Sequence, residues 1–149
     1  MALAFGEAKK GIEAGHGGPF GCVIVKDGEV IARGHNEVAR TNDPTAHAEI
    51  VTIRRASQKL ESFSLAGCIL YVTGEPCPMC FSAIHWARID KVVYCNTKAD
   101  AAAIGFDDAF ITEIILGEKP DPIPFVHRPD DACRALFRQW YDDPEKVPY

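Results

Sequence analysis

The stretch Glu75-Pro76-Cys77-Pro78-Met79-Cys80 places two cysteines three residues apart, where a helix is expected to begin. Pro78 suits the first helical position, because the N–H that it lacks would have no partner there, so Cys77 is the expected N-cap. Side chains three apart on a helix point the same way, and both sulfurs then lie at the positive end of the helix dipole. That position lowers the pKa of a thiol towards the thiolate that binds metals. The stretch therefore predicts a metal site at the start of a helix.

A third ligand is offered upstream by His47, in Thr45-Ala46-His47-Ala48-Glu49. Three ligands of the types His, Cys and Cys leave a fourth position open for water, as in catalytic zinc sites. A closed structural zinc site is the alternative, but such sites usually bring a second Cys or His pair, and the other cysteines are single residues in apolar runs. We expect one catalytic Zn²⁺ per subunit, held by His47, Cys77 and Cys80, with a bound water or hydroxide.

Glu49 follows the expected ligand His47 by two residues and comes one helical turn before the inward-facing Ile53. Zinc lowers the pKa of its bound water from roughly 16 to about 7, and the released proton must reach the substrate. We expect Glu49 to carry it, as general base and then as general acid. The alternative, a glutamate on a helix surface, does not account for its place beside the metal ligand.

The remaining pattern predicts an α/β domain. Strands that are apolar on both faces and alternate with helices indicate a central sheet with parallel pairs and helices on both faces. Asp27-Gly28 is a hairpin turn signal between the first two strands. The expected elements are a helix at 2–14, strands at 21–26 and 29–35, a polar loop at 36–43, a helix starting at Asp43-Pro44, a strand at 68–73, a helix at 78–88, a strand at 91–95, a helix at 97–104 and a segment at 105–116.

The C-terminal part carries four prolines between Lys119 and Pro129, so this segment is expected to be extended. Ile123 to Val126 is the candidate for a short edge strand. An amphipathic helix is expected at about 130–141, followed by a polar tail. We find no internal repeat and no second domain, and interpret residues 1–149 as a single domain.

The composition argues against several classes of protein. The chain has 149 residues, of which 47% are hydrophobic and 25% charged, and its net charge is −5, which gives no sign of a surface that binds polyanions. No run reaches the roughly 20 apolar residues of a membrane helix. Without a secretion signal, six cysteines indicate free thiols in a reducing cytoplasm. Outside the metal site we interpret the cysteines as small buried hydrophobes: Cys22, Cys68, Cys95 and Cys133.

Four segments together resemble the bacterial guanine deaminases of the cytidine/deoxycytidylate deaminase superfamily. They are Thr41-Asn42-Asp43-Pro44-Thr45-Ala46-His47-Ala48-Glu49, Glu75 to Cys80, Gly105-Phe106-Asp107-Asp108 and Gly17-Gly18-Pro19-Phe20-Gly21. The two zinc motifs are shared across the superfamily, and the other two segments are typical of a narrower group of proteins within it. The resemblance implies a three-layer α/β/α fold with a central mixed sheet of about five strands. It also implies hydrolysis of guanine to xanthine and ammonia, a step of purine catabolism or salvage.

The resemblance also implies that Asn36 and Asp108 contact the base. Guanine presents N–H donors, and ionised carboxylates accept from such donors. Helix N-capping is the alternative role for Asp107 and Asp108. We further expect Glu113 to face the same pocket and assist the departure of ammonia. Aromatic residues at helical spacing usually belong to the core, and Trp86 is the one that we expect to stack on the base.

By the same resemblance the chain is expected to form a homodimer. The Pro-rich segment 119–129 and the C-terminal helix and tail 130–149 would be exchanged between subunits, so that Tyr149 covers the neighbour's pocket.

Two other functions compete with guanine deamination. A tRNA-specific adenosine deaminase has the same zinc motifs but needs a basic groove for the phosphate backbone, against which the net charge and the acidic 105–108 segment argue. A zinc-stabilised binding domain without turnover is the non-enzymatic alternative, and the intact Glu49 argues against it. Other amino-substituted rings, such as aminotriazines, remain open as substrates.

Overall fold

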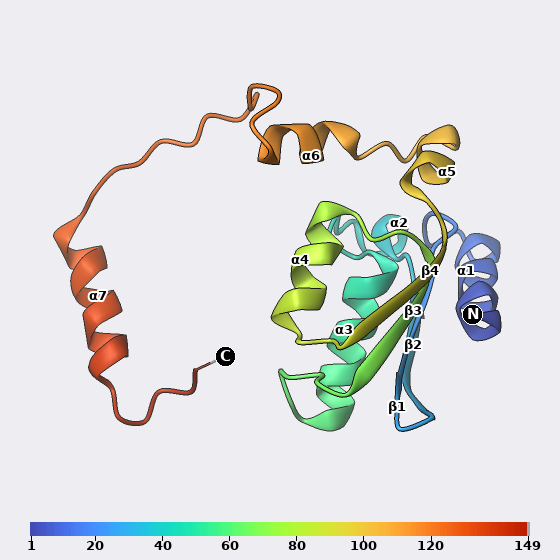
Figure 1. Ribbon diagram of the computed structural model, residues 1–149, viewed down its shortest axis with the longest axis horizontal. Helices are drawn as coiled ribbons and strands as arrows, with labels where there is room; N and C mark the ends of the chain where they lie inside the picture. Colours follow the sequence, from blue (N-terminus) through green and yellow to red (C-terminus); the bar gives the residue numbers. More distant parts are fainter. Residues whose placement is uncertain (149) are drawn as a thin grey trace.

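The computed structural model describes residues 1–148, and its centre is a mixed sheet of four strands in the order β2-β1-β3-β4 (Figure 1). Strand β1 (Gly21–Lys26) pairs antiparallel with both β2 (Glu29–His35) and β3 (Cys68–Gly74). Strand β4 (Lys91–Asn96) pairs parallel with β3. The predicted mixed sheet with a parallel pair is therefore confirmed, and its described strands come close to the expected number.

The β1–β2 hairpin forms where Asp27-Gly28 predicted it. Both turn residues have positive φ, 50° for Asp27 and 82° for Gly28, as a type I′ turn requires. The parallel pair needs a crossover instead, which helix α4 (Pro78–Trp86) supplies between β3 and β4.

Helices cover both faces of the sheet, so the predicted layered α/β/α arrangement is confirmed. Helix α1 (Ala2–Glu13) lies on one face, and α3 (Ala48–Leu60) and α4 lie on the other (Figure 1). The core between sheet and helices is closely filled by buried side chains, the largest of which are Ile24, Leu65, Leu70 and Val72. This packing fixes where α3 and α4 begin, and both begin at the same end of the sheet.

The start of α3 differs from the expectation. Its N-cap is His47 and not Asp43, because Asp43 Oδ1 already accepts hydrogen bonds from the backbone N–H and the hydroxyl of Thr45, at 2.8 and 2.7 Å. Asp43 therefore closes a local turn. The preceding stretch, expected to be a loop, contains a single helical turn, α2 (Val38–Thr41).

The C-terminal third stands apart from the layers. Helices α5 (Lys98–Ala103), α6 (Ala109–Ile115) and α7 (Asp131–Asp142) follow β4, and α7 stands away from the sheet (Figure 1). Every residue from 115 to 145 is exposed, and residues 123–126, the candidate edge strand, form no strand in the described chain. The predicted positions of the Pro-rich segment and of the last helix are confirmed. Across residues 1–148, no helix is both long and apolar enough to cross a bilayer.

The interpretation of the other four cysteines is right for two of them and wrong for two. Cys22 and Cys68 are buried, whereas Cys95 and Cys133 are exposed. Cys95 lies in β4, which has a sheet neighbour on one side only, and Cys133 lies in α7, where no residue is buried. An apolar run predicts a strand or a helix face but does not say whether anything covers it.

The close contact between α1 and β1 depends on Gly21. A Cβ atom there would overlap the α1 backbone at Ala4 and Ala8, whereas one at Gly6, inside α1, would meet nothing within 4 Å. We expect Gly21→Ala to lower the free energy of unfolding by about 1–3 kcal/mol through overpacking. Gly6→Ala should raise it by roughly 0.5–1 kcal/mol through helix propensity. Urea unfolding of both variants tests this pair, and equal stabilities would contradict it.

Candidate active site

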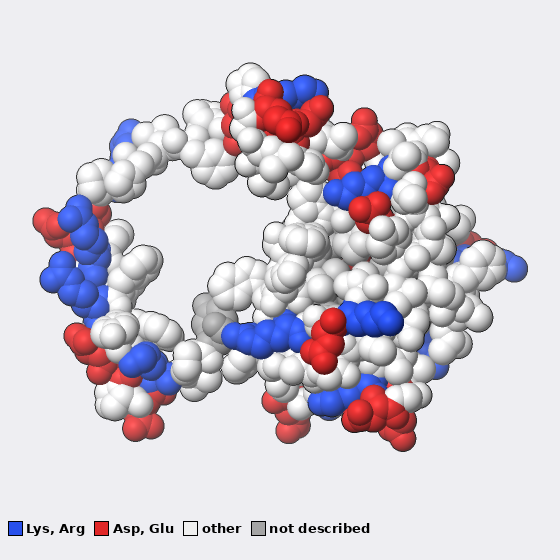
Figure 2. Space-filling model, in the orientation of Figure 1, with Lys and Arg blue, Asp and Glu red and all other residues white. Residues whose placement is uncertain are grey.

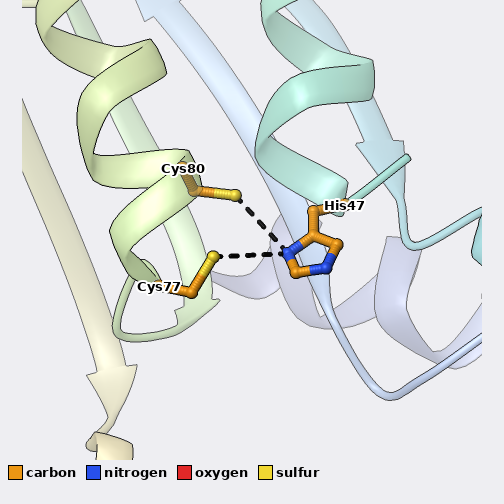
Figure 3. A group of neighbouring side chains, drawn as sticks. All are labelled: His47, Cys77 and Cys80. Carbon is orange, nitrogen blue, oxygen red and sulfur yellow. Dashed lines mark hydrogen bonds between the residues drawn. The ribbon is translucent and has the colours of Figure 1, made fainter. Parts of the chain in front are cut away.

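Three potential metal ligands meet where α3 and α4 begin. His47 is the N-cap of α3 and Cys77 the N-cap of α4, with Pro78 at the first helical position and Cys80 in the first turn. His47 Nδ1 lies 3.6 Å from Cys77 Sγ and 3.5 Å from Cys80 Sγ (Figure 3). The structure thus brings together the three ligands that the sequence predicted, and they form the one such group found among residues 1–148.

This donor set fits zinc. Tetrahedral Zn²⁺ with bonds of about 2.0–2.1 Å to nitrogen and about 2.3 Å to sulfur holds the two donor atoms roughly 3.6 Å apart. The separations from His47 Nδ1 to the two sulfurs have this value, and all three ligand atoms lie within 4.8 Å of one another. One nitrogen and two sulfurs also suit a borderline-soft ion better than Mg²⁺ or Ca²⁺, which prefer oxygen.

One of the two thiols, Cys77, is already favoured as a thiolate. Hydrogen bonds from Cys80 and His47, with the N-terminal backbone of α4, lower the pKa of Cys77 to about 4. The neighbouring Cys77 and burial raise the pKa of Cys80. The hydrogen bond to Cys77 raises the pKa of His47, with Glu49 and Asp108 adding to the effect. Negative charge is therefore concentrated at this point, which favours a divalent cation.

Glu49 lies in the first turn of α3 and is only 5% exposed. Burial raises its pKa above the usual value for a glutamate, and the negative charge of Cys77 acts in the same direction. A buried carboxyl with a raised pKa beside a metal site has the properties of a group that accepts and returns a proton. The surface alternative for Glu49 does not hold.

A cavity of about 310 Å³ opens directly over these groups. Its size lies at the lower end of the range for small-molecule sites. Half of its lining comes from residues already singled out: Asn36, His47, Glu49, Cys77, Asp107 and Asp108. A larger apolar groove of about 660 Å³ lies between α4 and α6 and does not include the metal ligands.

Asn36 lies at the end of β2 and is 5% exposed. Its Oδ1 accepts a hydrogen bond from the Val38 N–H at 3.2 Å, which fixes the orientation of the side-chain amide. Gly17 approaches the same amide so closely that a Cβ atom at Gly17 would overlap it. The motif Gly17-Gly18-Pro19-Phe20-Gly21 thus leaves space for the side chain of Asn36.

Asp107 and Asp108 divide the two roles that the sequence left open. Asp107 Oδ1 accepts from the Ala109 N–H at 3.0 Å and so supports the start of α6. Asp108 is the N-cap residue of α6, yet its side chain makes no capping bond. Its Oδ2 is shielded from solvent without a hydrogen-bond partner among the described residues. Asp108 therefore lines the cavity with a carboxylate that takes no part in capping α6.

The structure does not bring two other predicted residues, Glu113 and Trp86, to the cavity. Glu113 pairs with Lys119 at 2.6 Å and is not part of the lining. Trp86 is the last residue of α4, 67% exposed, and lies against a different depression. Tyr149 lies outside the described residues. Their roles in catalysis or binding stay predictions.

Six other lining residues were not among the predicted site residues: Phe20, Glu75, Lys98, Ala101, Gly105 and Phe106. Phe20 and Phe106 meet edge to face, with ring centroids 5.0 Å apart. Glu75 accepts from the backbone N–H of Lys98 at 3.1 Å, which ties the start of α5 to the ligand segment. Four of them, Phe20, Glu75, Gly105 and Phe106, belong to the sequence motifs quoted above. Their membership in those motifs could have identified them as site residues.

Comparisons with known proteins agree with this geometry. The chain is 48% identical over 143 residues to the guanine deaminase of Bacillus subtilis, which covers 95% of this chain and 92% of that protein. The crystal structure of the B. subtilis enzyme has a TM-score of 0.92 at 47% identity, covering 98% of this chain and 94% of the other. The tRNA-specific adenosine deaminase of Agrobacterium fabrum is 41% identical, covering 93% of this chain and 92% of its own.

A family model, the cytidine and deoxycytidylate deaminase zinc-binding region, matches residues 1–96, which contain all three predicted ligands and Glu49. That match covers more than half of the chain. The prediction from the zinc motifs is thereby confirmed, and the chain belongs to the cytidine and deoxycytidylate deaminase family.

Proposed function

We propose that the protein is a zinc-dependent aminohydrolase that converts guanine and water to xanthine and ammonia. The observation that carries this choice is Asp108, whose carboxylate lies beside the cavity with one oxygen shielded from solvent and unpaired within the described residues. A buried acceptor without a partner is costly, and a donor-rich ligand relieves that cost. Guanine presents N1–H and an exocyclic amino group, whereas adenine has an acceptor at N1.

The chain's own residues then have distinct tasks. Bound zinc would supply a hydroxide at neutral pH. Asn36 and Asp108 orient the base so that the carbon bearing the amino group faces the ligands. Glu49 would take one proton from the attacking water and pass it to the ring nitrogen. It would then take a second proton from the hydroxyl group added to the carbon and pass it to the leaving amine, which departs as ammonia. Glu113 remains a candidate for assisting that departure, although its carboxylate is paired with Lys119.

Adenosine in tRNA is the competing substrate, because several relatives at 41–49% identity are tRNA adenosine deaminases. Such a substrate calls for a basic surface that follows the phosphate backbone. On the face shown in Figure 2, Lys and Arg are interspersed with Asp and Glu and form no continuous basic surface. The cavity itself carries Glu75, Asp107 and Asp108 against a single Lys98, which favours a neutral base.

The protein acts as a homodimer in which the C-terminal segment of each chain packs on the other. Helix α7 is amphipathic, and its apolar side chains are exposed: Leu136 by 61%, Phe137 by 78%, Trp140 by 48% and Tyr141 by 71%. A helix of 12 residues is marginal in water without tertiary packing. The apolar groove between α4 and α6 is likewise open. A second copy supplies a cover for both surfaces, and its Tyr149 and Trp86 then become candidates for closing the cavity.

A reducing compartment, which we take to be the cytoplasm, suits the site. All six cysteines are free, and oxidation of Cys77 and Cys80 to a disulfide would remove two of the three expected ligands.

The purified protein should release ammonia from guanine and not from tRNA. Asp108→Asn removes the charged acceptor and should raise the KM for guanine about 10-fold or more, since a charge-assisted hydrogen bond contributes roughly 1.5–3 kcal/mol. Asp107→Asn is the matched control and should leave KM within about 2-fold, because that side chain supports α6. Coupled ammonia assays measure both, and release from tRNA alone would overturn the proposed substrate.

Glu49→Gln keeps the shape of the side chain but removes its titratable proton. We expect kcat to fall by on the order of 10²–10⁴, the usual contribution of general acid–base catalysis, with the fold intact. Zinc content per chain, measured by atomic emission, should equal that of the wild type. A fully active variant would refute the role of Glu49, and a variant without zinc would show that Glu49 acts on the metal site instead.

Complementation tests the exchanged segment. A chain ending at residue 129 and a full-length Glu49→Gln chain should each be inactive. Co-refolded in equal amounts, they should recover about a quarter of wild-type activity, because half of the dimers are mixed and one of their two sites then has both Glu49 and a C-terminal segment. An inactive mixture that contains mixed dimers would contradict exchange.

A further inference from the structure

Two histidines behind the cavity are hydrogen-bonded to each other and have no place in the chemistry described above. His16 Nδ1 lies 2.9 Å from His35 Nε2, and the rings stack with centroids 5.1 Å apart at 26°. One of the two nitrogens must carry a proton and the other must not, so the pair forms a directed hydrogen bond. The His35 side chain is only 12% exposed.

Charged groups on α1 and beyond β2 hold His35 in place. Its Nδ1 lies 3.5 Å from Oε2 of Glu7, a buried residue of α1, and Lys10 contacts the other oxygen of that carboxylate at 2.8 Å. On the other side, Glu37 Oε1 lies 4.0 Å from His35 Nε2 and binds Arg55 at 2.7 Å. The imidazole is thus held at both ring nitrogens and has little freedom to rotate.

The histidine pair connects the two chain segments that enclose Asn36. His35 directly precedes Asn36, and His16 directly precedes Gly17, whose backbone lies against the Asn36 amide. The Asn36 N–H also donates to the Phe20 carbonyl at 2.9 Å. The segment from His16 to Phe20 therefore forms one wall around Asn36, and β2 forms the other.

That wall needs an anchor. It contains Gly17 and Gly18 and follows Gly15, which has a φ of 68°, and glycine loses more backbone entropy on ordering than any other residue. In the stretch from Gly15 to Gly18, His16 has the one side chain, so its bond to His35 is the side-chain contact that ties this stretch to the sheet. The Gly11 carbonyl, which accepts from the His16 N–H at 2.9 Å, adds a backbone contact.

We infer that His16 and His35 are positioning residues, which hold the Asn36 amide in the orientation that binds the base. This inference rests on the proposed function, because it takes Asn36 as a contact of the substrate. Neither histidine lines the cavity, so both act through Asn36. The expected effect falls on substrate affinity and leaves the proton transfer by Glu49 unchanged.

Kinetics with guanine separate this role from a general structural one. His16→Leu and His35→Asn remove the bond between the rings and should raise KM about 3- to 10-fold, the worth of one hydrogen bond, with kcat within about 2-fold. His35→Gln places an amide where Nε2 was and should restore KM. In an Asn36→Ala background, His16→Leu should change KM no further, because the two changes act on one contact. Additive effects on KM would overturn the inference.

Amide spectra test the orientation without any substrate. The chain contains three asparagines, Asn36, Asn42 and Asn96, and the last two are exposed. Selective ¹⁵N labelling of asparagine therefore gives three side-chain NH₂ pairs, and the pair missing in Asn36→Ala identifies Asn36. Its exchange with water should be slow in the wild type and several-fold faster in His16→Leu. Unchanged exchange would also overturn the inference.

Lys9→Met is the matched control, because it removes an exposed lysine of α1 that pairs with Glu13 and leaves Glu7 and the histidine pair intact. Its spectrum and KM should equal those of the wild type. A protein that does not act on guanine but shows the expected exchange rates would refute the proposed function and support the positioning of Asn36. Active protein with unchanged exchange rates would refute the positioning alone.

Discussion

The convergence of one nitrogen and two sulfurs at the starts of α3 and α4 is the constraint on which the rest of the structure depends. His47 Nδ1 keeps separations of 3.6 and 3.5 Å from the two thiols only if both helices begin at the same end of the sheet. Strands β2 and β3 make this possible, because both run antiparallel to β1 and therefore finish at the same end of the sheet, where the chain goes on to α3 and α4. Glu49 is the second residue of α3, so the same helix start buries it beside the ligands.

Local rules were enough to predict one half of this centre, the two cysteines at the start of α4. The start of α4 could be predicted because proline and the capping position depend on neighbouring residues alone. The β1–β2 hairpin could be predicted for the same reason, from Asp27-Gly28. The start of α3 could not, because Asp43 has two local partners available, a helix end and the Thr45 turn, and the turn is formed. Whether Asp43 caps a helix or closes a turn then depends on the tertiary structure, which places the start of α3 at His47.

The roles of the two neighbouring aspartates show a further limit. Asp107 and Asp108 are consecutive residues of the same type, and both were candidates for capping the following helix. Only the path of the backbone decides that Asp107 supports the first turn of α6 and that Asp108 faces the cavity. Glu113 illustrates the opposite case, in which a plausible spacing does not bring the carboxylate to the site, because Lys119 lies close enough to pair with it. A sequence pattern therefore identifies a set of candidates, and the fold selects among them.

The exposed apolar surface of the C-terminal third connects the proposed dimer to the chemistry of the cavity. The apolar face of α7 and the groove beside α4 are both open in a single chain, and burying such surface contributes roughly 25 cal/mol per Å². A chain that gains this burial only from a second copy has a stability that depends on its concentration. The metal centre, by contrast, lies entirely within residues 1–96 of one chain. If the proposed dimer forms, its dissociation should therefore leave zinc bound while it opens the cavity, so that dilution weakens substrate binding before it affects the metal.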